Sequence, residues 1–408
     1  MKPHALAAVT AGLCLAALPA ASAQADVFNG RIAFSSFRSD PTFKTGDVFT
    51  INNDGTDLRQ LTTNPADDAQ SDWAPDGRDI VYRIRKPNSR INFEVSRMTA
   101  AGQGVTTLTD SPAGVASSQP AWYPDRSAIL FRRSGGTDGP GSIWHMGPLG
   151  EQPELLFDPP GAQLYPSLSP DMSRLLFATR KSEIGDTDRA VESMAADGTG
   201  LTTLFDVPNA YDSAPSWSPD GTRVAFESDA DVAGGNPERD MEIWMMGADG
   251  SDPTQLTHNT LHDEGPAWSP DGAMLAYSSG LDNLHLDINV MTTEGVHLRT
   301  LTDFEGRDES PDWQTIPAPD TDRRCGDIAT GGPLDVRAAG HGLRCRKARK
   351  LAARWSRSEK SGTRPARLHG FDADVTDFGG TLRVVLTRRG DRDDDTGNDK
   401  LVTFLYQP

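Results

Sequence analysis

Short apolar runs, each bounded by turn-forming residues, recur along most of the chain. Five of these runs end in an aromatic residue that lies nine residues after a Trp or Leu; these aromatic residues are Tyr82, Phe131, Phe177, Phe226 and Tyr277. The residues between the Trp and the run hold a Pro-Asp segment, as in Trp217-Ser-Pro-Asp-Gly221. This pattern predicts two β-strands joined by a tight hairpin.

A second hairpin follows in each unit. An apolar residue stands four positions before a Gly, and a Leu follows six positions after it; the glycines are Gly55, Gly102, Gly150, Gly198, Gly250 and Gly295. Each unit therefore contains four strands, and its length varies from 45 residues (Trp268 to Trp313) to 51 residues (Trp217 to Trp268). Four-stranded units of this length predict the blades of an all-β propeller.

The two ends of the repeat region predict how the ring closes. Residues 28–62 contain the second, third and fourth strands of a unit, but no Trp strand precedes them. Glu309-Ser-Pro-Asp-Trp313 supplies a Trp strand with no unit after it. Placing the Trp313 strand in the first blade completes six blades and removes two exposed strand edges. We therefore expect a six-bladed β-propeller over residues 26–316.

The repeat resembles that of a known family. Its Trp-Ser-Pro-Asp-Gly turn, Met-x-x-Asp-Gly turn and Leu-Thr ending are similar to the TolB-like, WD-related propeller repeat of exported bacterial proteins. TolB itself has an α/β domain before its propeller, whereas here only a few residues separate the expected export signal from the first blade. The resemblance implies the propeller fold, without the TolB N-terminal domain.

The first 25 residues have the features of an export signal. Lys2 is followed by an apolar stretch from Ala5 to Leu18, and Ala21-Ser-Ala23 provides the small residues of a cleavage site. The apolar stretch is too short to span a bilayer. We therefore expect an exported protein of the periplasm, the cell envelope or the secreted space, without membrane insertion.

The C-terminal residues 317–408 differ in composition from the propeller. Residues 318–408 hold 18 basic and 13 acidic residues, in a chain whose net charge is −18. Cys325 and Cys345 are the two cysteines outside the signal, and in an oxidising compartment they predict a disulfide, the alternative being two buried thiols. A helical pattern over residues 344–357 and strand patterns over 381–387 and 400–406 predict a small, basic α+β domain.

The lengths of the connections separate the two faces of the expected propeller. Both hairpins of a unit keep a constant length, whereas the connections from the second to the third strand vary. Variable loops on a rigid scaffold usually carry the binding residues. We therefore expect the variable-loop face to bind a protein or a cell-envelope polymer, and the acidity of the chain argues against nucleic acid.

Acidic residues recur at the start of the Trp strands. An Asp lies five residues before the Trp in four blades, and other acids lie beside it; the candidate binding residues are Asp68, Asp212, Asp263, Glu264, Asp308 and Glu309. If the Trp strand is innermost, these carboxylates ring the mouth of the central channel. Asp212, Asp263 and Asp308 are then candidates to hold Ca²⁺ or Mg²⁺, or a basic segment of a partner. The alternative is that each Asp caps a turn.

Catalytic motifs are missing from the sequence. There is no Gly-x-Ser-x-Gly elbow, and no cysteine outside the signal lies in an activating setting. His258 and His262 have no helix to bring them to one face, which favours a solvated loop over a metal site. We therefore expect a non-enzymatic binding scaffold without a cofactor. The alternative is a cation-dependent enzyme acting on an acidic sugar or a similar small substrate at the channel mouth.

Overall fold

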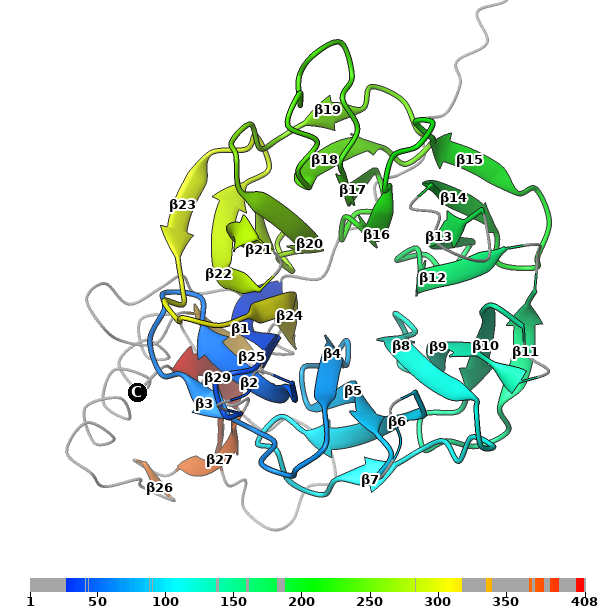
Figure 1. Cartoon of the computed structure of the whole chain (residues 1–408). Coiled ribbons are helices and arrows are strands. Elements are labelled where there is room, and N and C mark those ends of the chain that lie inside the picture. The colour runs from blue at the N-terminus through cyan, green and yellow to red at the C-terminus, as the bar shows by residue number, and fades with distance from the viewer. Residues whose placement is uncertain are drawn as a thin grey trace, which may run out of the picture.

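Six antiparallel sheets of four strands each surround a central axis (Figure 1). The structure, a computed structural model, describes residues 27–317 apart from residues 41, 43, 88, 90, 137–138, 159–160, 182–187 and 283. It also describes the backbone of five later strands, at residues 335–339, 367–368, 371–377, 382–388 and 401–406. The prediction of a six-bladed propeller is confirmed.

Each blade is an up-and-down sheet whose first strand lies nearest the axis (Figure 1). Blade 1 consists of β24 (Asp308–Pro317), β1 (Val27–Ser36), β2 (Asp47–Asn52) and β3 (Arg59–Gln60). Blade 2 consists of β4 (Asp68–Trp73), β5 (Asp79–Arg85), β6 (Phe93–Thr99) and β7 (Thr106–Thr107). Blade 3 consists of β8 (Ala116–Trp122), β9 (Ile129–Ser134), β10 (Ser142–Met146) and β11 (Glu154–Phe157). Blade 4 consists of β12 (Ala162–Leu168), β13 (Arg174–Arg180), β14 (Arg189–Ala195) and β15 (Thr202–Phe205). Blade 5 consists of β16 (Ser213–Trp217), β17 (Arg223–Ser228), β18 (Glu242–Gly247) and β19 (Thr254–Gln255). Blade 6 consists of β20 (His262–Trp268), β21 (Met274–Asp282), β22 (His285–Thr292) and β23 (His297–Thr300).

The predicted closure of the ring is confirmed. Strand β24 pairs antiparallel with β1, with Ile32 opposite Trp313, so that both ends of the repeat region share blade 1. Strands β1, β2 and β3 supply the rest of that blade. Because each blade then contacts two neighbours, the ring leaves no blade with an uncovered face.

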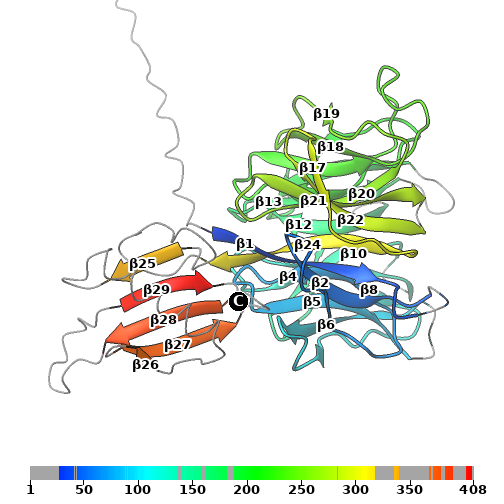
Figure 2. The ribbon, with the colours of Figure 1, turned by 90° about the vertical axis from the view of Figure 1, so that its left-hand side faces the viewer.

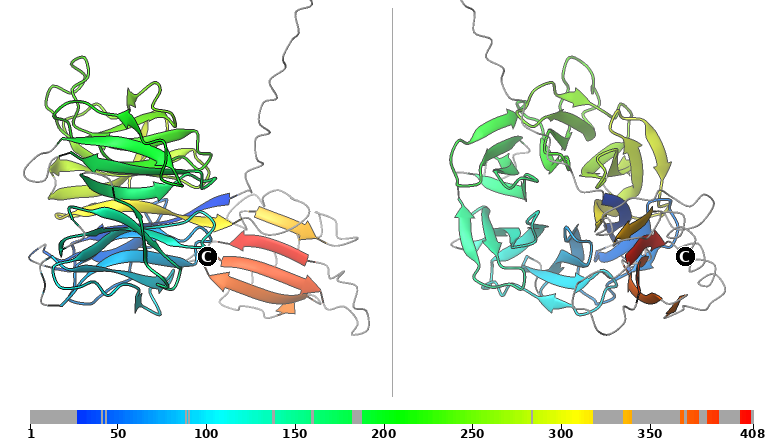
Figure 3. Two further views of the ribbon diagram at one scale, coloured as in Figure 1. Left: turned by 90° about the vertical axis from the view of Figure 1, so that its right-hand side faces the viewer. Right: turned by 180° about the vertical axis from the view of Figure 1, so that it is seen from behind.

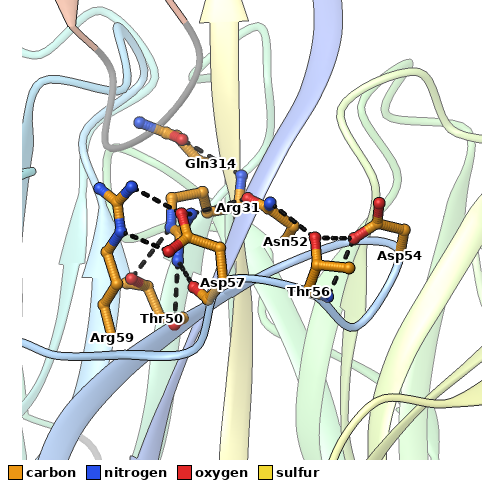
Figure 4. A network of polar contacts seen from close by, with 8 residues as sticks. All are labelled: Arg31, Thr50, Asn52, Asp54, Thr56, Asp57, Arg59 and Gln314. Atoms are coloured by element: carbon orange, nitrogen blue, oxygen red, sulfur yellow. Dashed lines mark hydrogen bonds and ion pairs between the residues drawn. The ribbon is translucent and has the colours of Figure 1, made fainter. Parts of the chain in front are cut away.

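A buried arginine strengthens the closing blade (Figure 4). Arg31 is 1% exposed, and its side chain donates hydrogen bonds to Thr50 Oγ1 at 3.0 Å and Asp57 Oδ2 at 3.0 Å. Gln314 of β24 accepts a hydrogen bond from the backbone N–H of Arg31 at 3.2 Å and donates one to the carbonyl of Gly77 at 2.8 Å. A buried charge is stable only when it is paired and hydrogen-bonded, and here that pairing lies beside the strand that closes the ring.

The repeated turn residues explain the hairpins. In blade 5, the Asp220 carboxylate accepts hydrogen bonds from the Ser218 hydroxyl at 2.6 Å and from the backbone N–H of Thr222 at 3.0 Å. Gly221 has a φ of 70°, a left-handed conformation that glycine adopts without steric cost. The Ser-Pro-Asp-Gly sequence therefore specifies this turn through local hydrogen bonds and one backbone conformation.

The core lies between the blades. Trp217 and Phe226 of blade 5 pack in one cluster with Leu176 and Val191 of blade 4. The same pattern joins blades 2 and 3, where Trp122 packs with residues of β5 and β6. The Trp and aromatic positions of the repeat are thus the residues that hold each blade to its neighbour.

A five-stranded antiparallel sheet follows the propeller (Figures 2 and 3). Its strands are β25 (Asp335–Ala339), β26 (Arg367–Leu368), β27 (Phe371–Asp377), β28 (Leu382–Arg388) and β29 (Leu401–Tyr406), in the order β25-β29-β28-β27-β26. The two strands expected over 381–387 and 400–406 correspond to β28 and β29. The expected signal, the expected helix over 344–357 and the Cys325–Cys345 pair lie outside the described residues. Within the described part of the chain, no helix is both long and apolar enough to cross a membrane.

Candidate functional site

The inner strands enclose a central channel. Both hairpins of each blade lie at one end of the channel, which we call the hairpin face. The loops between the second and third strands of each blade, such as β5–β6, and the connections between blades lie at the other end, which we call the loop face. Toward the hairpin face the channel forms a cavity of about 500 Å³, lined mainly by Pro, Trp and Ser side chains. Asp72 and Asp312 are the charged residues of its lining. This half of the channel is therefore weakly polar, with its two carboxylates close together at one place.

Every inner strand has a bulge at the same position. The residue three before the Trp or Leu has a left-handed φ of 43° to 63°; these residues are Gln70, Gln119, Tyr165, Ala214, Gly265 and Ser310. The register of strand pairing shifts at the same place, for instance between Ser118 and Ala121. Five of the six are not glycine, and such residues adopt this conformation only where the surrounding structure enforces it.

Hydrogen bonds between blades hold the bulges. The backbone N–H of Gln119 donates to Gln70 Oε1 at 3.2 Å, and that of Tyr165 donates to Gln119 Oε1 at 3.1 Å. On the other side of the ring, the N–H of Gly265 donates to Glu227 Oε2 at 2.8 Å. The bulge turns these amides toward the preceding blade, so the channel wall is built from contacts that cross blade boundaries.

The four aspartates predicted at the channel mouth lie beneath its surface. Asp68, Asp212, Asp263 and Asp308 are each 0% exposed. Asp212 accepts hydrogen bonds from the Ser228 hydroxyl at 2.5 Å and from the backbone N–H of Val207 at 3.1 Å. Asp263 accepts one from Asn259 at 2.8 Å, within the connection that leads into its blade. Because these aspartates are buried, they act on a ligand only indirectly, through the loops whose conformation they hold.

Burial changes the acidity of these aspartates. It raises the pKa of Asp212 to about 7 and that of Asp68 to about 6, because the charged form loses its hydration. The pKa values of Asp263 and Asp308 are also raised, with burial as the largest cause in each case. The three aspartates proposed as metal ligands belong to different blades. Within the part of the chain that the structure describes, no three His, Cys, Asp or Glu side chains are placed to hold a metal ion.

The other two predicted residues, Glu264 and Glu309, do belong to the mouth of the channel at the loop face. Arg307 lies between them: its guanidinium pairs with Glu309 and is 3.8 Å from Glu264. His262 pairs with Glu264 at 3.0 Å, whereas His258 is exposed in the loop before it. Burial raises the pKa of Glu309 to about 7, against the opposing effect of Arg307.

A second balanced group lies on blade 2. Arg83 and Arg85 both pair with the Asp67 carboxylate, at 2.9 Å and 2.7 Å. Next to this group, a groove of about 710 Å³ runs between residues 61–67 and 84–87 and reaches Gly102 and Val105 of the β6–β7 hairpin. Carboxylates and guanidinium groups therefore neutralise one another over blades 1 and 2.

On blade 4, Lys181 pairs with Asp188 and Asp206, whereas Arg132, Arg180, Arg189 and Glu227 of blades 3 to 5 form no ion pair with another described residue. Arg132, Arg180 and Arg189 lie at the loop-side ends of β9, β13 and β14. Glu227 of blade 5 is buried next to Glu264, and both burial and that neighbouring charge raise its pKa to about 7. Tyr165 lines the channel between these groups, within electrostatic range of Arg189 and Glu227. The mouth is thus positive on one side and acidic on the other.

The sequence predicted some parts of this site and missed others. Of the six candidate binding residues, Glu264 and Glu309 lie at the loop-side mouth, whereas the four aspartates are buried. The prediction missed the arginines, whose signal was available: Arg83 and Arg132 each directly follow the aromatic residue of their repeat. In the structure that position lies opposite the inner strand, with Ser118 paired to Arg132. It also missed the inward-facing Asp72 and Asp312, which directly precede Trp73 and Trp313.

Comparison with known proteins agrees with the fold. The TolB beta propeller domain family matches residues 149–320 of this chain. A Bacillus subtilis protein named as an uncharacterized peptidase, YuxL, is 33% identical over 102 residues, which make up 24% of this chain and 15% of that protein. The chain therefore spans a small part of the length of this relative.

Solved structures show the same architecture. TolB from Acinetobacter baumannii matches 70% of this chain and 66% of its own, with a TM-score of 0.58 and 17% identity. A chain of the nidogen/laminin complex matches 71% of this chain and 100% of its own, with a TM-score of 0.54 and 12% identity. At these levels of identity the similarity shows the fold alone.

Proposed function

Since this chain carries a TolB-like six-bladed β-propeller, we propose that it is an exported binding protein that engages a protein or a cell-envelope polymer at the loop-face mouth of its channel. The observation that carries this proposal is the set of charged side chains held around that mouth by the loop-side ends of the inner strands and of the strands next to them. Propellers of this architecture bind proteins elsewhere, as in the nidogen/laminin complex. Rigid strands that present charged groups beside variable loops are the usual design of a binding surface.

The charged mouth favours a partner with charges of its own. Arg307, Glu264 and Glu309 are half-buried, with exposed side-chain fractions of 32%, 19% and 12%. Their low exposure means that a ligand group entering the mouth meets them after losing most of its water, where charge complementarity discriminates best between partners. The long connection between β17 and β18 and the groove beside blade 2 add variable contacts around this centre.

Capture of the partner from the native organism tests the proposal. The exported protein, with Glu264→Gln and Glu309→Gln combined, is compared with the unsubstituted chain and with Glu294→Gln. Glu294 is an exposed acid in the β22–β23 hairpin, at the opposite face. We expect the double variant to lose a captured partner that the control retains, with the thermal midpoint of both variants within a few degrees. Equal capture by all three proteins would refute binding at this mouth.

The enzyme alternative makes a different prediction. A cation-dependent enzyme needs a tightly bound ion, which elemental analysis of the purified protein detects directly. On the binding proposal, we expect no stoichiometric Ca²⁺, Mg²⁺ or Mn²⁺, and no change in thermal midpoint on adding a chelator. An ion held at one equivalent and removed by chelation would instead favour the enzyme.

A further inference from the structure

Three arginines of blades 3 and 4 lie near one another on the loop side, and Glu227 of blade 5 is within electrostatic range of one of them, Arg189. Arg132 lies on β9, while Arg180 and Arg189 lie directly opposite each other on β13 and β14. The other arginines at the loop-side mouth, Arg83 and Arg307, pair with carboxylates. Among the described residues, no carboxylate lies within ion-pair distance of the three. The scaffold therefore holds like charges together at one side of the channel.

The three side chains are close enough to act on one another. The charges of Arg180 and Arg189 add to the effect of burial and lower the pKa of Arg132 to about 10. Tyr165, which lines the channel, lies within electrostatic range of both Arg132 and Arg189. The group therefore lies near the part of the channel wall that Tyr165 forms.

The scaffold also fixes how two of the guanidinium groups lie. Arg132 donates to the carbonyl of Pro140 at 2.6 Å and lies over Gly141, where a Cβ atom would come within 2.6 Å of its Nε. Arg189 stacks on Tyr211, with its guanidinium carbon 3.6 Å from the ring centre, and donates to Ser213 Oγ at 3.0 Å. Such contacts hold the donors in place before a ligand arrives.

Donor groups remain available in the cluster. The Nε atoms of Arg132, Arg180 and Arg189 are buried, and within the described part of the chain they have no hydrogen-bond acceptor. The same holds for the Nε atoms of Arg83 and Arg307, but those two side chains pair with carboxylates through their other nitrogens. A buried donor without an acceptor costs free energy. An oxyanion offers what is missing, because its oxygens accept paired N–H donors from a guanidinium group and its charge offsets the repulsion among the three cations.

We propose that Arg132, Arg180 and Arg189 form a binding site for an oxyanion, the carboxylate or phosphate group of a ligand that enters the channel from the loop face. This site deepens the proposed function, on which it rests, by naming a chemical class for one part of the ligand. It reverses the expectation from the acidic sequence, which pointed to a cation or a basic partner. Glu227 and Glu264, on the acidic side of the mouth, would then face the rest of the ligand.

Calorimetric titration with two probes tests the site. Inorganic phosphate and succinate are titrated into the purified full chain at low ionic strength, with chloride at matched ionic strength as the reference. We expect one or both probes to bind, and Arg132→Gln or Arg180→Gln to weaken that binding on the order of tenfold or more, since each removes a charge-assisted pair of hydrogen bonds. Binding of phosphate alone would assign a phosphate ligand, and binding of succinate alone a carboxylate ligand.

Arg83→Gln is the matched control. Arg83 occupies the same position of blade 2 as Arg132 does of blade 3, but it pairs with Asp67. We expect the control to keep the affinity of the unsubstituted protein within about twofold. Without ligand, Arg132→Gln should not lower the thermal midpoint, because it removes one of three like charges, so loss of binding is separable from loss of fold.

Two results would overturn the site. One is the absence of any heat or midpoint change from either probe beyond that of chloride. The other is an equal loss of binding in Arg83→Gln and Arg132→Gln, which would indicate a diffuse charge effect. The titration needs no partner, whereas the proposed function is tested by capture through Glu264 and Glu309. Either can therefore fail while the other stands.

Discussion

Asp212 offers the sharpest test of whether the buried aspartates support the loops. Its carboxylate is 0% exposed, accepts hydrogen bonds from Ser228 and Val207, and has its pKa raised from 3.8 to about 7 by burial. The folded state therefore holds this proton more tightly than the unfolded chain does. The stability that the proton contributes is complete below pH 4 and is lost as the pH rises from 4 to 7.

The magnitude follows from the change in proton affinity. A tenfold change corresponds to about 1.4 kcal/mol, so a pKa near 7 in place of 3.8 gives a loss of about 4 kcal/mol between pH 4 and pH 8. Asp212→Asn removes the titration and keeps the geometry. Its amide oxygen can accept from Val207, and its NH₂ group can donate to the Ser228 hydroxyl oxygen.

Denaturant unfolding at pH 4.5 and pH 8 measures the effect. We expect Asp212→Asn to gain several kcal/mol relative to the unsubstituted protein as the pH rises. Asp212→Ala should instead be destabilised by about 2 kcal/mol even at pH 4.5, since the buried hydroxyl of Ser228 and the N–H of Val207 lose their acceptor. A difference between Asp212→Asn and the unsubstituted protein that is the same at both pH values would refute the reasoning, because it would show that the carboxylate does not titrate in this range.

Three further predictions concern the closure of the ring. Trp313→Ala should lower the free energy of unfolding by about 3 to 5 kcal/mol, because it empties a buried site in blade 1, and a loss below about 1 kcal/mol would argue against closure by β24. Gly77→Ala should lower the free energy of unfolding in urea more than Gly104→Ala does, although both glycines have a similar left-handed φ. The reason is that only a Cβ at position 77 would lie 2.1 Å from the carbonyl oxygen of Thr315. Equal losses in the two variants would contradict this. Arg31→Met should lower the thermal midpoint by an amount equivalent to about 3 kcal/mol, and an unchanged midpoint would show that its polar contacts add no net stability.

The two halves of the channel have different chemistry. Toward the hairpin face the lining contains Pro, Trp and Ser with two carboxylates, and burial raises the pKa of Asp312 to about 7. At the loop face, paired charges surround half of the mouth and the arginine group occupies another part. A ligand group that enters from the loop face therefore meets charged side chains first and a nearly uncharged cavity beyond them.

The local sequence determined the blades and their number. A Ser-Pro-Asp-Gly turn is stabilised by hydrogen bonds among its own residues, and the alternation of apolar residues sets each strand. The position of Trp313, with no unit after it, was sufficient to predict the pairing of β24 with β1. These features depend on residues close together in the chain or on a repeat count, so one sequence could reveal them.

Only the tertiary structure decided the chemistry of the channel. Arg132 and Arg189 are 57 positions apart in the chain, and they interact because the ring places blades 3 and 4 side by side. The sequence gives no sign that Tyr165 adopts a left-handed φ, because this conformation is held by the hydrogen bond that its N–H donates to Gln119 of the preceding blade. Nor does it show that Asp212 is buried while Glu264 lines the mouth, since burial depends on how the blades pack around the axis. A repeated motif specifies the scaffold, but which charges meet is set by neighbours that are distant in the chain.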